Sequence, residues 1–340
     1  VYFYPVDELL MENVTLRNNV GRVGAGLVCP RGNGTFRNCV FDNNDTTDEY
    51  DSRSSNIYFC ADGDVMIENC IFANSYAAEQ YDDCSHAVHT VSLFGAQYVE
   101  PKIDIYNSLF YNNSLPIGSV FTMRGPYNLD NNVANDTLSS IINCTFVGNS
   151  SPDETINLNG NHNIYNTIFY DNETGYEVGL FYNSYVPPST FNFSHCNIEG
   201  GQSAISNWYE GNIVNWLDGN IDADPLFYGE GEDYPFYSLT AESPCINAGT
   251  TELPEGVVLP EFDLAGNPRV VGETIDMGCY EFQFPQNAED YELPVSHNYQ
   301  LANHPNPFTG ETTISFSLTT NLHENTRIEI FNIKGQLVKQ

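Results

Sequence analysis

The chain has 340 residues, of which 45 are acidic and 11 are basic, and its formal net charge is −34. This charge excludes nucleic acids and anionic membranes as expected partners, because both are bound by clustered Lys and Arg. Hydrophobic residues make up 41% of the sequence, enough for a packed core, and no apolar run reaches the roughly 20 residues that a membrane span needs.

One short pattern recurs between residues 13 and 198. It consists of an apolar residue, a variable one, Asn, a small residue, a variable one and an aromatic residue, and its fullest copies occupy residues 36–43, 67–74, 105–112, 141–146 and 164–169. The anchors are separated by 25, 31, 38, 36, 23 and 29 positions, and they are Asn13, Asn38, Asn69, Asn107, Asn143, Asn166 and His195. Periods of this length are typical of solenoid repeats.

The repeat predicts β-strands rather than helices. It is rich in β-branched and aromatic residues, it alternates with a period of two, and Asn and Gly bound it. A further predicted strand follows in most repeats, for example at residues 26–29 and 57–60. We therefore predict an all-β protein, with a parallel β-helix over residues 1–220.

Stacking of the repeats makes specific predictions about equivalent side chains, which lie about 4.8 Å apart in neighbouring parallel strands. The repeated Phe is expected to stack inward. The repeated Asn amides are expected to bond along the stack, in a ladder of Asn38, Asn69, Asn107, Asn143 and Asn166.

Cysteines also recur at equivalent positions. Cys39, Cys70 and Cys144 occupy one position of the repeat, and Cys29 and Cys60 share another. Such cysteines either form disulfides between neighbouring repeats or act as small buried core residues. We favour the second interpretation.

A different signature follows residue 221. Its four motifs lie at residues 222–227, 243–249, 263–270 and 275–281, and together with the repeats they resemble the right-handed β-helix proteins of the choice-of-anchor Q type. The resemblance implies a right-handed β-helix whose last coil is covered by a C-terminal cap, residues 221–282. The chain departs from that family in carrying Cys279 where Ala is usual, and a disulfide between Cys245 and Cys279 is one interpretation of this departure.

The last part of the chain has its own signature. Residues 283–297 are polar and contain Pro, as in a linker. Residues 298–340 include Asn306-Pro307-Phe308 and the strand pattern at 327–338, and they are similar to the first half of the type IX secretion C-terminal sorting domain of the Bacteroidota, a small β-sandwich. The resemblance implies recognition by the type IX secretion machinery and a secreted or cell-surface protein.

Catalysis is considered because many parallel β-helices cut polysaccharides. A hydrolase needs paired carboxylates, and a lyase needs a basic residue and often Ca²⁺. The candidates are Lys102, Asp104 and Arg124, of which the first two are spaced to present an acid–base pair on one strand. The charge of −34 opposes binding of a polyanionic uronate, and surface charges are the alternative interpretation.

Aromatic residues offer a site for sugar rings, which stack on exposed aromatic faces. Tyr residues at outward or turn positions of the repeats, and two Trp near residue 210, make up the candidate set Tyr106, Tyr165, Trp208 and Trp216, with Tyr111 and Tyr170 beside it. Tyr also simply suits a β surface, and this alternative stays open.

Acidic loops are candidates for metal ions. Ca²⁺ takes six to eight oxygen ligands, and the candidate cluster is Asp42, Asp45, Asp48 and Asp51. A solvated acidic loop is the alternative that we favour. A second loop, with Asp82, Asp83, His86 and His89, is a weaker metal candidate.

Two short sequences resemble the O-glycosylation motif of the Bacteroidota, and they place glycans on Thr46 and Thr137. Taken together, the sequence favours a non-enzymatic structural or adhesive module outside the cell, which contacts extracellular glycans or associates with itself. The alternative is a polysaccharide hydrolase or lyase on the same scaffold.

Overall fold

The computed structural model describes residues 1–2, 7–21, 25–46, 54–77, 89–95, 102–116, 118–124, 138–181, 188–229, 235–272 and 274–283, and four short strands between residues 300 and 339. The chain forms two compact units, Val1–Phe284 and Pro285–Gln340. Within the described ranges the protein is all-β, and its single helical turn is the 3₁₀ helix η1 at Gly201–Ala204.

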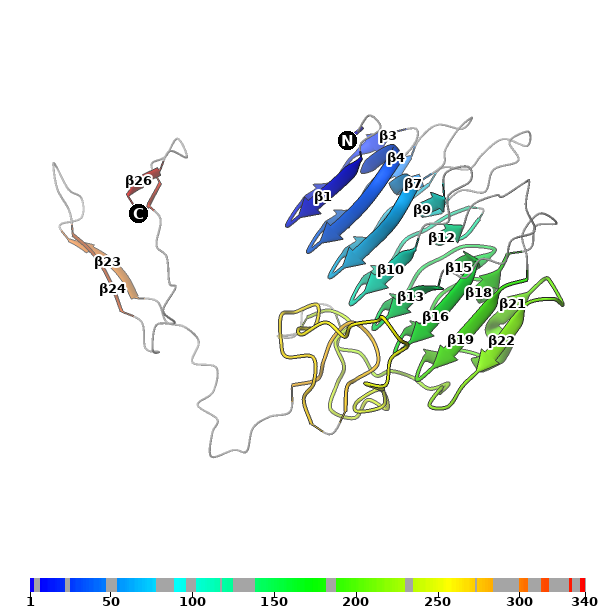
Figure 1. The fold of residues 1–340 in the computed structure, drawn as a ribbon. Helices are drawn as coiled ribbons and strands as arrows, with labels where there is room; N and C mark the ends of the chain where they lie inside the picture. Colours follow the sequence, from blue (N-terminus) through cyan, green and yellow to red (C-terminus); the bar gives the residue numbers. More distant parts are fainter. Residues whose placement is uncertain are drawn as a thin grey trace. The chain divides into compact units, whose positions relative to one another are not determined.

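The repeats stack in chain order, from blue to green in Figure 1, and each contributes one short strand to a seven-stranded parallel sheet. Its strands are β2 (Thr15–Arg17), β5 (Val40–Asp42), β8 (Ile71–Ala73), β11 (Leu109–Tyr111), β14 (Thr145–Val147), β17 (Ile168–Tyr170) and β20 (Asn197–Ile198). Each strand holds the aromatic or aliphatic residue of the repeat at its centre, and register partners are equivalent residues, such as Phe72 and Phe110.

A larger sheet of 13 strands contains two parallel lines of strands, joined through the long strands β4 and β7. The line we call the β10 line consists of β1 (Glu8–Glu12), the second halves of β4 (Leu27–Arg37) and β7 (Ser54–Glu68), and β10 (Ile103–Tyr106), β13 (Leu138–Ile142), β16 (Asn161–Tyr165), β19 (Thr190–Ser194) and β22 (Ile213–Trp216). The β12 line consists of the first halves of β4 and β7, and β9 (His89–Gly95), β12 (Phe121–Arg124), β15 (Glu154–Asn159), β18 (Tyr176–Leu180) and β21 (Ile205–Asn207). A short parallel pair, β3 (Val20–Gly21) and β6 (Asp45–Thr46), completes the first repeats.

The core lies between these sheets. Five phenylalanine rings stack face to face along it, with centroids 4.5–4.9 Å apart and interplanar angles of 4–10°: Phe41, Phe72, Phe110, Phe146 and Phe169. The predicted inward stack of Phe is thus confirmed. The long parallel sheets are compatible with the β-helix that the repeats predict.

The repeated Asn marks a sharp corner between the β10 line and the seven-stranded sheet. All five predicted ladder residues have positive φ, between 46° and 53°, a left-handed conformation that Asn tolerates better than other side chains. In the first repeats the amides bond along the stack: Nδ2 of Asn38 donates to Oδ1 of Asn13, and that of Asn69 to Asn38, each at 3.3 Å.

In the later repeats the same corner holds the segment 222–282. Nδ2 of Asn107 donates to the carbonyl oxygen of Phe262 at 2.6 Å. The amide of Asn166 donates to the carbonyl oxygen of Thr250 at 2.9 Å and accepts the backbone N–H of Thr250 at 2.8 Å. Asn143 likewise donates to a carbonyl of this segment.

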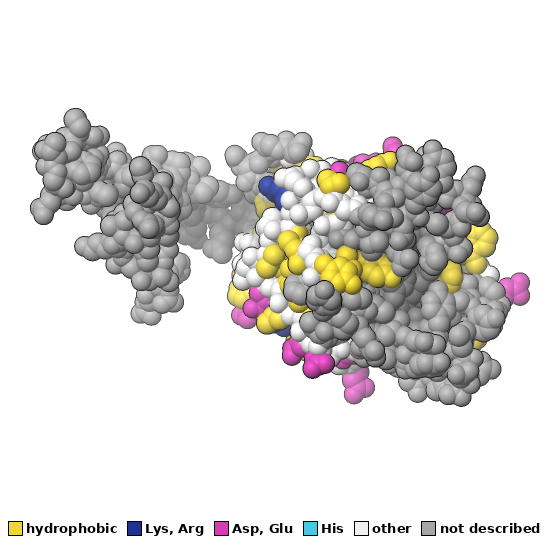
Figure 2. Space-filling view, turned by 90° about the horizontal axis from the view of Figure 1, so that it is seen from above, with side chains coloured by type: hydrophobic (Ala, Val, Ile, Leu, Met, Phe, Trp, Pro, Cys, Tyr) yellow, Lys and Arg dark blue, Asp and Glu magenta, His cyan; other side chains and the backbone are white. Residues whose placement is uncertain are grey.

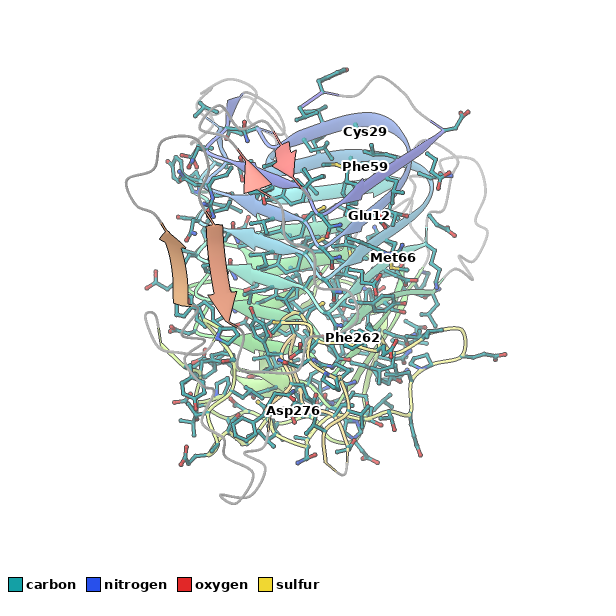
Figure 3. All side chains as sticks on the ribbon, turned by 90° about the vertical axis from the view of Figure 1, so that its left-hand side faces the viewer. Glu12, Cys29, Phe59, Met66, Phe262 and Asp276 are labelled. Atoms are coloured by element: carbon teal, nitrogen blue, oxygen red, sulfur yellow. The ribbon has the colours of Figure 1, made fainter. Side chains whose placement is uncertain are left out.

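We call residues 222–282 the lateral segment, because they lie along the side of the repeats. Its apolar residues form two clusters on the outer face of the seven-stranded sheet, one with Leu109 and Val147 and the other with Ile168. Figure 3 shows Phe262 and Asp276 against the later repeats, away from Phe59 in the first ones. The sequence predicted a cap over the last coil. In the structure the segment flanks several repeats, and its hydrogen-bond partners include their corner asparagines.

Buried charges hold the lateral segment together. Arg269 is 1% exposed, and its Nη2 donates to the carbonyl oxygens of Asp276 (3.1 Å) and Gly278 (2.6 Å). Its Nε lies 3.9 Å from the carboxylate of Glu281. The carboxylate of Asp263 accepts three backbone N–H groups, at 2.8–3.0 Å.

The cysteines whose side chains are described are buried thiols. Cys29 is in register with Phe59. Cys29 and Cys60 are therefore offset by one position, whereas the sequence suggested that they share the same position. Cys245 and Cys279 lie in two different apolar clusters, and the structure does not pair them.

The second unit has two antiparallel strand pairs in its described residues. β23 (Gln300–His304) pairs with β24 (Thr313–Ser317), and β25 (Ile330–Phe331) pairs with β26 (Leu337–Lys339). Apart from Gln283, the predicted linker 283–297 lies outside the described residues.

Candidate functional site

The outer face of the β10 line carries a continuous row of polar side chains. Successive strands bring equivalent residues into register, and the row, which we call the polar row, contains Asp104, Ser140, Asn163, Asn192 and Asn215. Its asparagines bond along the stack, since Nδ2 of Asn192 donates to Oδ1 of Asn163 at 2.9 Å and Nδ2 of Asn215 donates to Oδ1 of Asn192 at 2.8 Å.

The predicted acid–base pair lies at one end of this row. Nζ of Lys102 is 2.7 Å from Oδ2 of Asp104, whose side chain is 5% exposed. Because the two groups form an ion pair, Lys102 neutralises Asp104 and is not a free base. Arg124 belongs to β12, in the other line of strands, and its side chain is not among those described.

Three atoms of the polar row lack hydrogen-bond partners within the described part of the chain. They are Oδ1 of Asp104, Oγ of Ser140 and Nδ2 of Asn163, and all three are buried. An unsatisfied buried polar atom costs roughly 1–3 kcal/mol, so such atoms usually bind water or a ligand. Three of them lie in register on adjacent strands, and the row continues into the partly exposed Asn192 and Asn215, so this row is the strongest candidate binding face.

The predicted sugar-binding aromatics do not form one site. Tyr106 is only 6% exposed, which corrects its prediction as an exposed contact; burial, and next the charge of Asp104, raise the pKa of its hydroxyl. Tyr165 is half-buried and shares a register row with Tyr106, with Ile142 between them. Trp216 packs on Phe193 at the end of the core, with centroids 5.9 Å apart, whereas Trp208 is 69% exposed.

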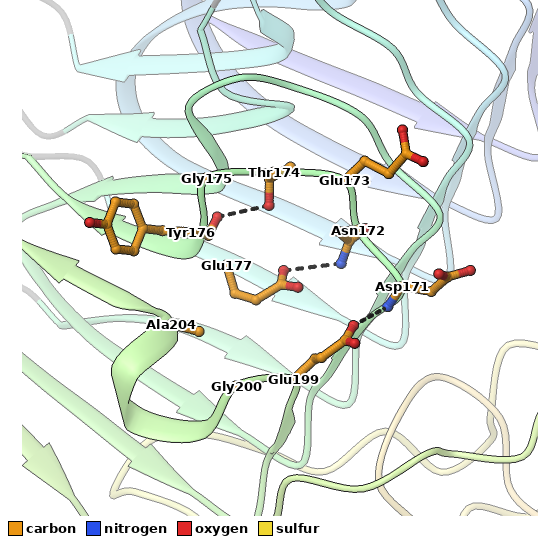
Figure 4. Close-up of a pocket in the computed structure, with 10 residues that line it drawn as sticks. All are labelled: Asp171, Asn172, Glu173, Thr174, Gly175, Tyr176, Glu177, Glu199, Gly200 and Ala204. Carbon is orange, nitrogen blue, oxygen red and sulfur yellow. Dashed lines mark hydrogen bonds between the residues drawn. The ribbon is translucent and has the colours of Figure 1, made fainter.

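An open pocket of about 280 Å³ lies where β17 ends and β18 begins (Figure 4). Glu177 points into it and is 5% exposed, and its Oε2 accepts hydrogen bonds from Oγ1 of Thr155 (2.8 Å) and Nδ2 of Asn172 (3.0 Å). Burial raises the pKa of Glu177 to about 7. Across the pocket, the exposed Glu199 accepts the backbone N–H of Asp171 at 2.7 Å.

Sequence reasoning missed Glu177. The available signal was a single Glu within the short strand Tyr176–Leu180, whose residues from Glu177 to Leu180 are all buried. With a pKa near neutrality, Glu177 is a carboxylic acid that exchanges its proton at physiological pH, and Glu199 is a nearby carboxylate. This pair is the part of the described structure best suited to general acid–base chemistry.

The candidate calcium residues are engaged in other contacts where they are described. Asp42 lies 2.6 Å from Nε of Arg17 and accepts Nδ2 of Asn74 at 2.8 Å, and Asp45 accepts the backbone N–H of Tyr76 at 2.9 Å. Asp48 and Asp51 lie outside the described residues, as do Asp82, Asp83 and His86. Across the described ranges, no three metal-binding side chains gather at one point.

The two O-glycosylation candidates differ in what the structure describes. Thr46 is fully buried in β6, so a glycan on its hydroxyl is incompatible with the folded chain, and this prediction is corrected. Thr137 lies outside the described residues.

Comparison with known proteins bears on the second unit. Residues 303–340 match the family model described as the secretion system C-terminal sorting domain. No match was found among curated proteins or solved structures. No described helix is long and apolar enough to cross a membrane. The C-terminal domain marks this chain as a cargo of the type IX secretion system, and the protein is exported to the cell surface or the extracellular space.

Proposed function

We propose that this exported protein is a right-handed parallel β-helix of the choice-of-anchor Q type that works as an adhesive module and binds a neutral glycan along the outer face of the β10 line. The observation that carries the proposal is the polar row, which continues from the buried and unpartnered atoms of Asp104, Ser140 and Asn163 into the partly exposed amides of Asn192 and Asn215. Glycans present hydroxyl groups, which both donate and accept hydrogen bonds and suit such a mixed set.

The charge of the chain supports a neutral ligand over an acidic one. The net charge is −34, and the described cation beside the polar row, Lys102, is already paired with Asp104. A uronate polymer would therefore meet a repulsive field. Tyr165, half-buried beside Asn163 on the same strand, supplies an aromatic face for a sugar ring.

The test is a binding screen of the purified full chain against neutral and uronate polysaccharides by affinity electrophoresis. We expect retention in one or more neutral gels, and at least a tenfold loss of affinity in Tyr165→Ala and in Asn192→Ala. Tyr176→Ala is the matched control, because Tyr176 is 41% exposed but lies on β18, outside the β10 line. Retention that survives both substitutions, or no retention in any neutral gel, would reject this face as the binding site.

A polysaccharide hydrolase is the second candidate, and the pocket of Glu177 is the observation that favours it. A carboxyl with its pKa raised to about 7 suits the general acid of a glycosidase, and Glu199 supplies the second carboxylate. Release of reducing ends, abolished in Glu177→Gln and retained in Glu173→Gln, would establish it. If no reducing ends are released from neutral or acidic polysaccharides, the result favours the adhesive function.

Self-association is a property of the adhesive module that the same preparation tests. Figure 2 looks onto the end of the stack that contains the N-terminal repeats and shows hydrophobic side chains across it. Leu10 and Val20 are 57% and 67% exposed there, and Ile213 of the last described repeat is 56% exposed. We expect a solution mass that rises with concentration in sedimentation, falling back to the monomer in Val20→Lys, since Val20 lies on β3, outside the β10 line; a constant monomer mass would exclude stacking of the ends.

A further inference from the structure

One position of the repeat carries a small polar or thiol side chain from the second repeat on. It is the residue after the first corner of the repeat, and its occupants are Cys39, Cys70, Ser108, Cys144, Thr167 and Cys196, whereas the first repeat has Val14 there. Their side chains face the interior, where all of them are buried. The order along the stack matters, because a hydroxyl separates every pair of thiols except Cys39 and Cys70.

Where the next repeat carries a hydroxyl at this position, the cysteine donates its backbone N–H to that hydroxyl. The N–H of Cys70 donates to Oγ of Ser108 at 3.1 Å, and that of Cys144 donates to Oγ1 of Thr167 at 3.4 Å. At Cys39 the corresponding group of the next repeat is the thiol of Cys70. A hydrogen bond from that thiol lowers the pKa of Cys39, whereas burial raises the pKa of Cys70.

The register fixes how close the two cysteines are. Val40 pairs with Ile71 in parallel β5 and β8, so the residues that precede them, Cys39 and Cys70, are direct neighbours along the stack. Neighbouring parallel strands are about 4.8 Å apart, within the roughly 4.4–6.8 Å between Cα atoms that a disulfide allows.

We propose that Cys39 and Cys70 form a disulfide that joins the first two full repeats of the exported protein. The structure shows their reduced form. Disulfides form and persist outside the cytoplasm, which is where this protein is delivered. The site is independent of glycan binding, because both thiols face the core and not the outer face of the β10 line.

The reaction needs an oxidant, which we assign to a disulfide compound, either a small molecule or a thiol oxidoreductase. Because both thiols are buried in the folded chain, they meet this oxidant before the first repeats fold or when these repeats open. The thiolate of Cys39 attacks one sulfur of that disulfide and expels the other as a thiolate. The thiolate of Cys70 then attacks Sγ of Cys39 and expels the second thiolate. Two protein thiols become one disulfide, the oxidant is reduced to two thiols, and the two protons pass to the expelled sulfurs.

At this position of the repeat, no other two cysteines are adjacent along the stack. Thr167 separates Cys144 from Cys196, and Cys29 is in register with Phe59. Cys245 and Cys279 lie in separate clusters. Cys39 and Cys70 are therefore the one pair of described cysteines that are adjacent at this position of the repeat.

The decisive experiment maps the thiols of the full chain, exported into an oxidising compartment or incubated with oxidised glutathione. The protein is denatured, alkylated without reductant, and cut after Arg and Lys and after Glu. Cleavage after Arg37 and Glu68 places Cys39 and Cys70 in peptides that contain neither Cys60 nor Cys84. We expect one linked species joining these peptides, which disappears on reduction. Alkylation of both residues after oxidation would overturn the proposal.

Thermal unfolding gives a second readout. Reduction should lower the Tm of the oxidised protein by about 5 °C, because the bond closes a 31-residue loop. Cys39→Ser should remove this dependence on reductant, and Cys196→Ser, at the same position beside a hydroxyl, should keep it. A reductant effect that persists in Cys39→Ser would assign the stabilisation to another pair and reject this one.

Discussion

The stacked repeats and the lateral segment satisfy their buried polar groups in two different ways. The repeats use the same small solution many times, with corner asparagines at positive φ and side-chain bonds to the next repeat. The lateral segment has almost no regular strand pairing and relies on a few buried charged groups, above all Arg269 and Asp263. Stability is therefore distributed in the first region and concentrated in the second.

The largest effect is expected in the core of the repeats. Phe110→Ala removes the central ring of the five-membered stack, where the ring contacts both neighbours at 4.5–4.7 Å, and should cost about 3–5 kcal/mol of unfolding free energy. Denaturant unfolding measures this cost. Phe262→Ala is the control, since Phe262 is 47% exposed. An equal cost for the two variants would mean that the stack contributes no special stability.

A somewhat smaller and more local loss is expected for Arg269→Ala. Removal of this buried cation leaves Glu281 and its neighbours unpaired, which typically costs about 3 kcal/mol or more. Limited proteolysis should show cleavage within residues 222–282 before the repeats are cut. The control is Arg37→Ala, because Arg37 pairs with Glu12 and Glu68 at the surface, where such a change costs less than about 1 kcal/mol. Simultaneous cleavage of both regions would contradict the separation of the two regions.

The pH dependence of stability tests the buried carboxyl of the repeats. The folded pKa of Glu177 is raised to about 7 from 4.5, so its contribution is fully present below pH 4.5 and is lost as the pH rises through 7. The shift corresponds to roughly 3 kcal/mol at most. Glu177→Gln should therefore stabilise the protein at pH 8 but not at pH 4, as measured by Tm, while Glu173→Gln changes neither. A uniform gain at both values would assign the effect to something other than ionisation.

The smallest effect is expected at the corner asparagine, which has two roles: it adopts the left-handed backbone and its amide forms hydrogen bonds. Asn38→Ala should cost about 1 kcal/mol, because a left-handed backbone is strained for Ala, and Asn38→Gly should cost less. Asn166→Gly should cost more than Asn38→Gly, because the two hydrogen bonds to Thr250 that it removes are partly buried and 2.8–2.9 Å long, whereas the two that Asn38 makes are exposed and 3.3 Å long. Chemical denaturation of these three variants and of Asn166→Ala separates the cost of backbone strain from the cost of lost hydrogen bonds. Equal costs for the two glycine variants would show that the contacts to the lateral segment add no stability.

Much of the repeat region follows from local sequence. The phenylalanine stack and the parallel strands were predictable because one short pattern repeats and its alternation has a period of two. The position of the lateral segment was not, since its partners are the side chains of Asn107 and Asn166, and no pattern within the segment points to them.

The candidate site was less predictable than the fold. Alternation tells which side of a strand a residue faces, but not what covers it, and so Tyr106 was taken as exposed although it is buried beside Asp104. The ion pair of Lys102 and Asp104 followed from a spacing of two along one strand. Glu177 was missed because its burial depends on Asn172 and Thr155, which approach only in the folded chain.

The spacing of the two corners in a repeat limits where the chain can accept insertions. From Asn107 to Asn112, as from Asn38 to Asn43 and from Asn69 to Asn74, the two positive-φ corners are five residues apart, whatever the length of the repeat. One residue inserted there would turn Phe110 from the core to the surface. Insertions in the connections from the β12 line to the β10 line leave the five-residue spacing of the corners unchanged. Loop grafts belong on that side of the molecule, where new recognition sequences can be exchanged without redesign of the scaffold.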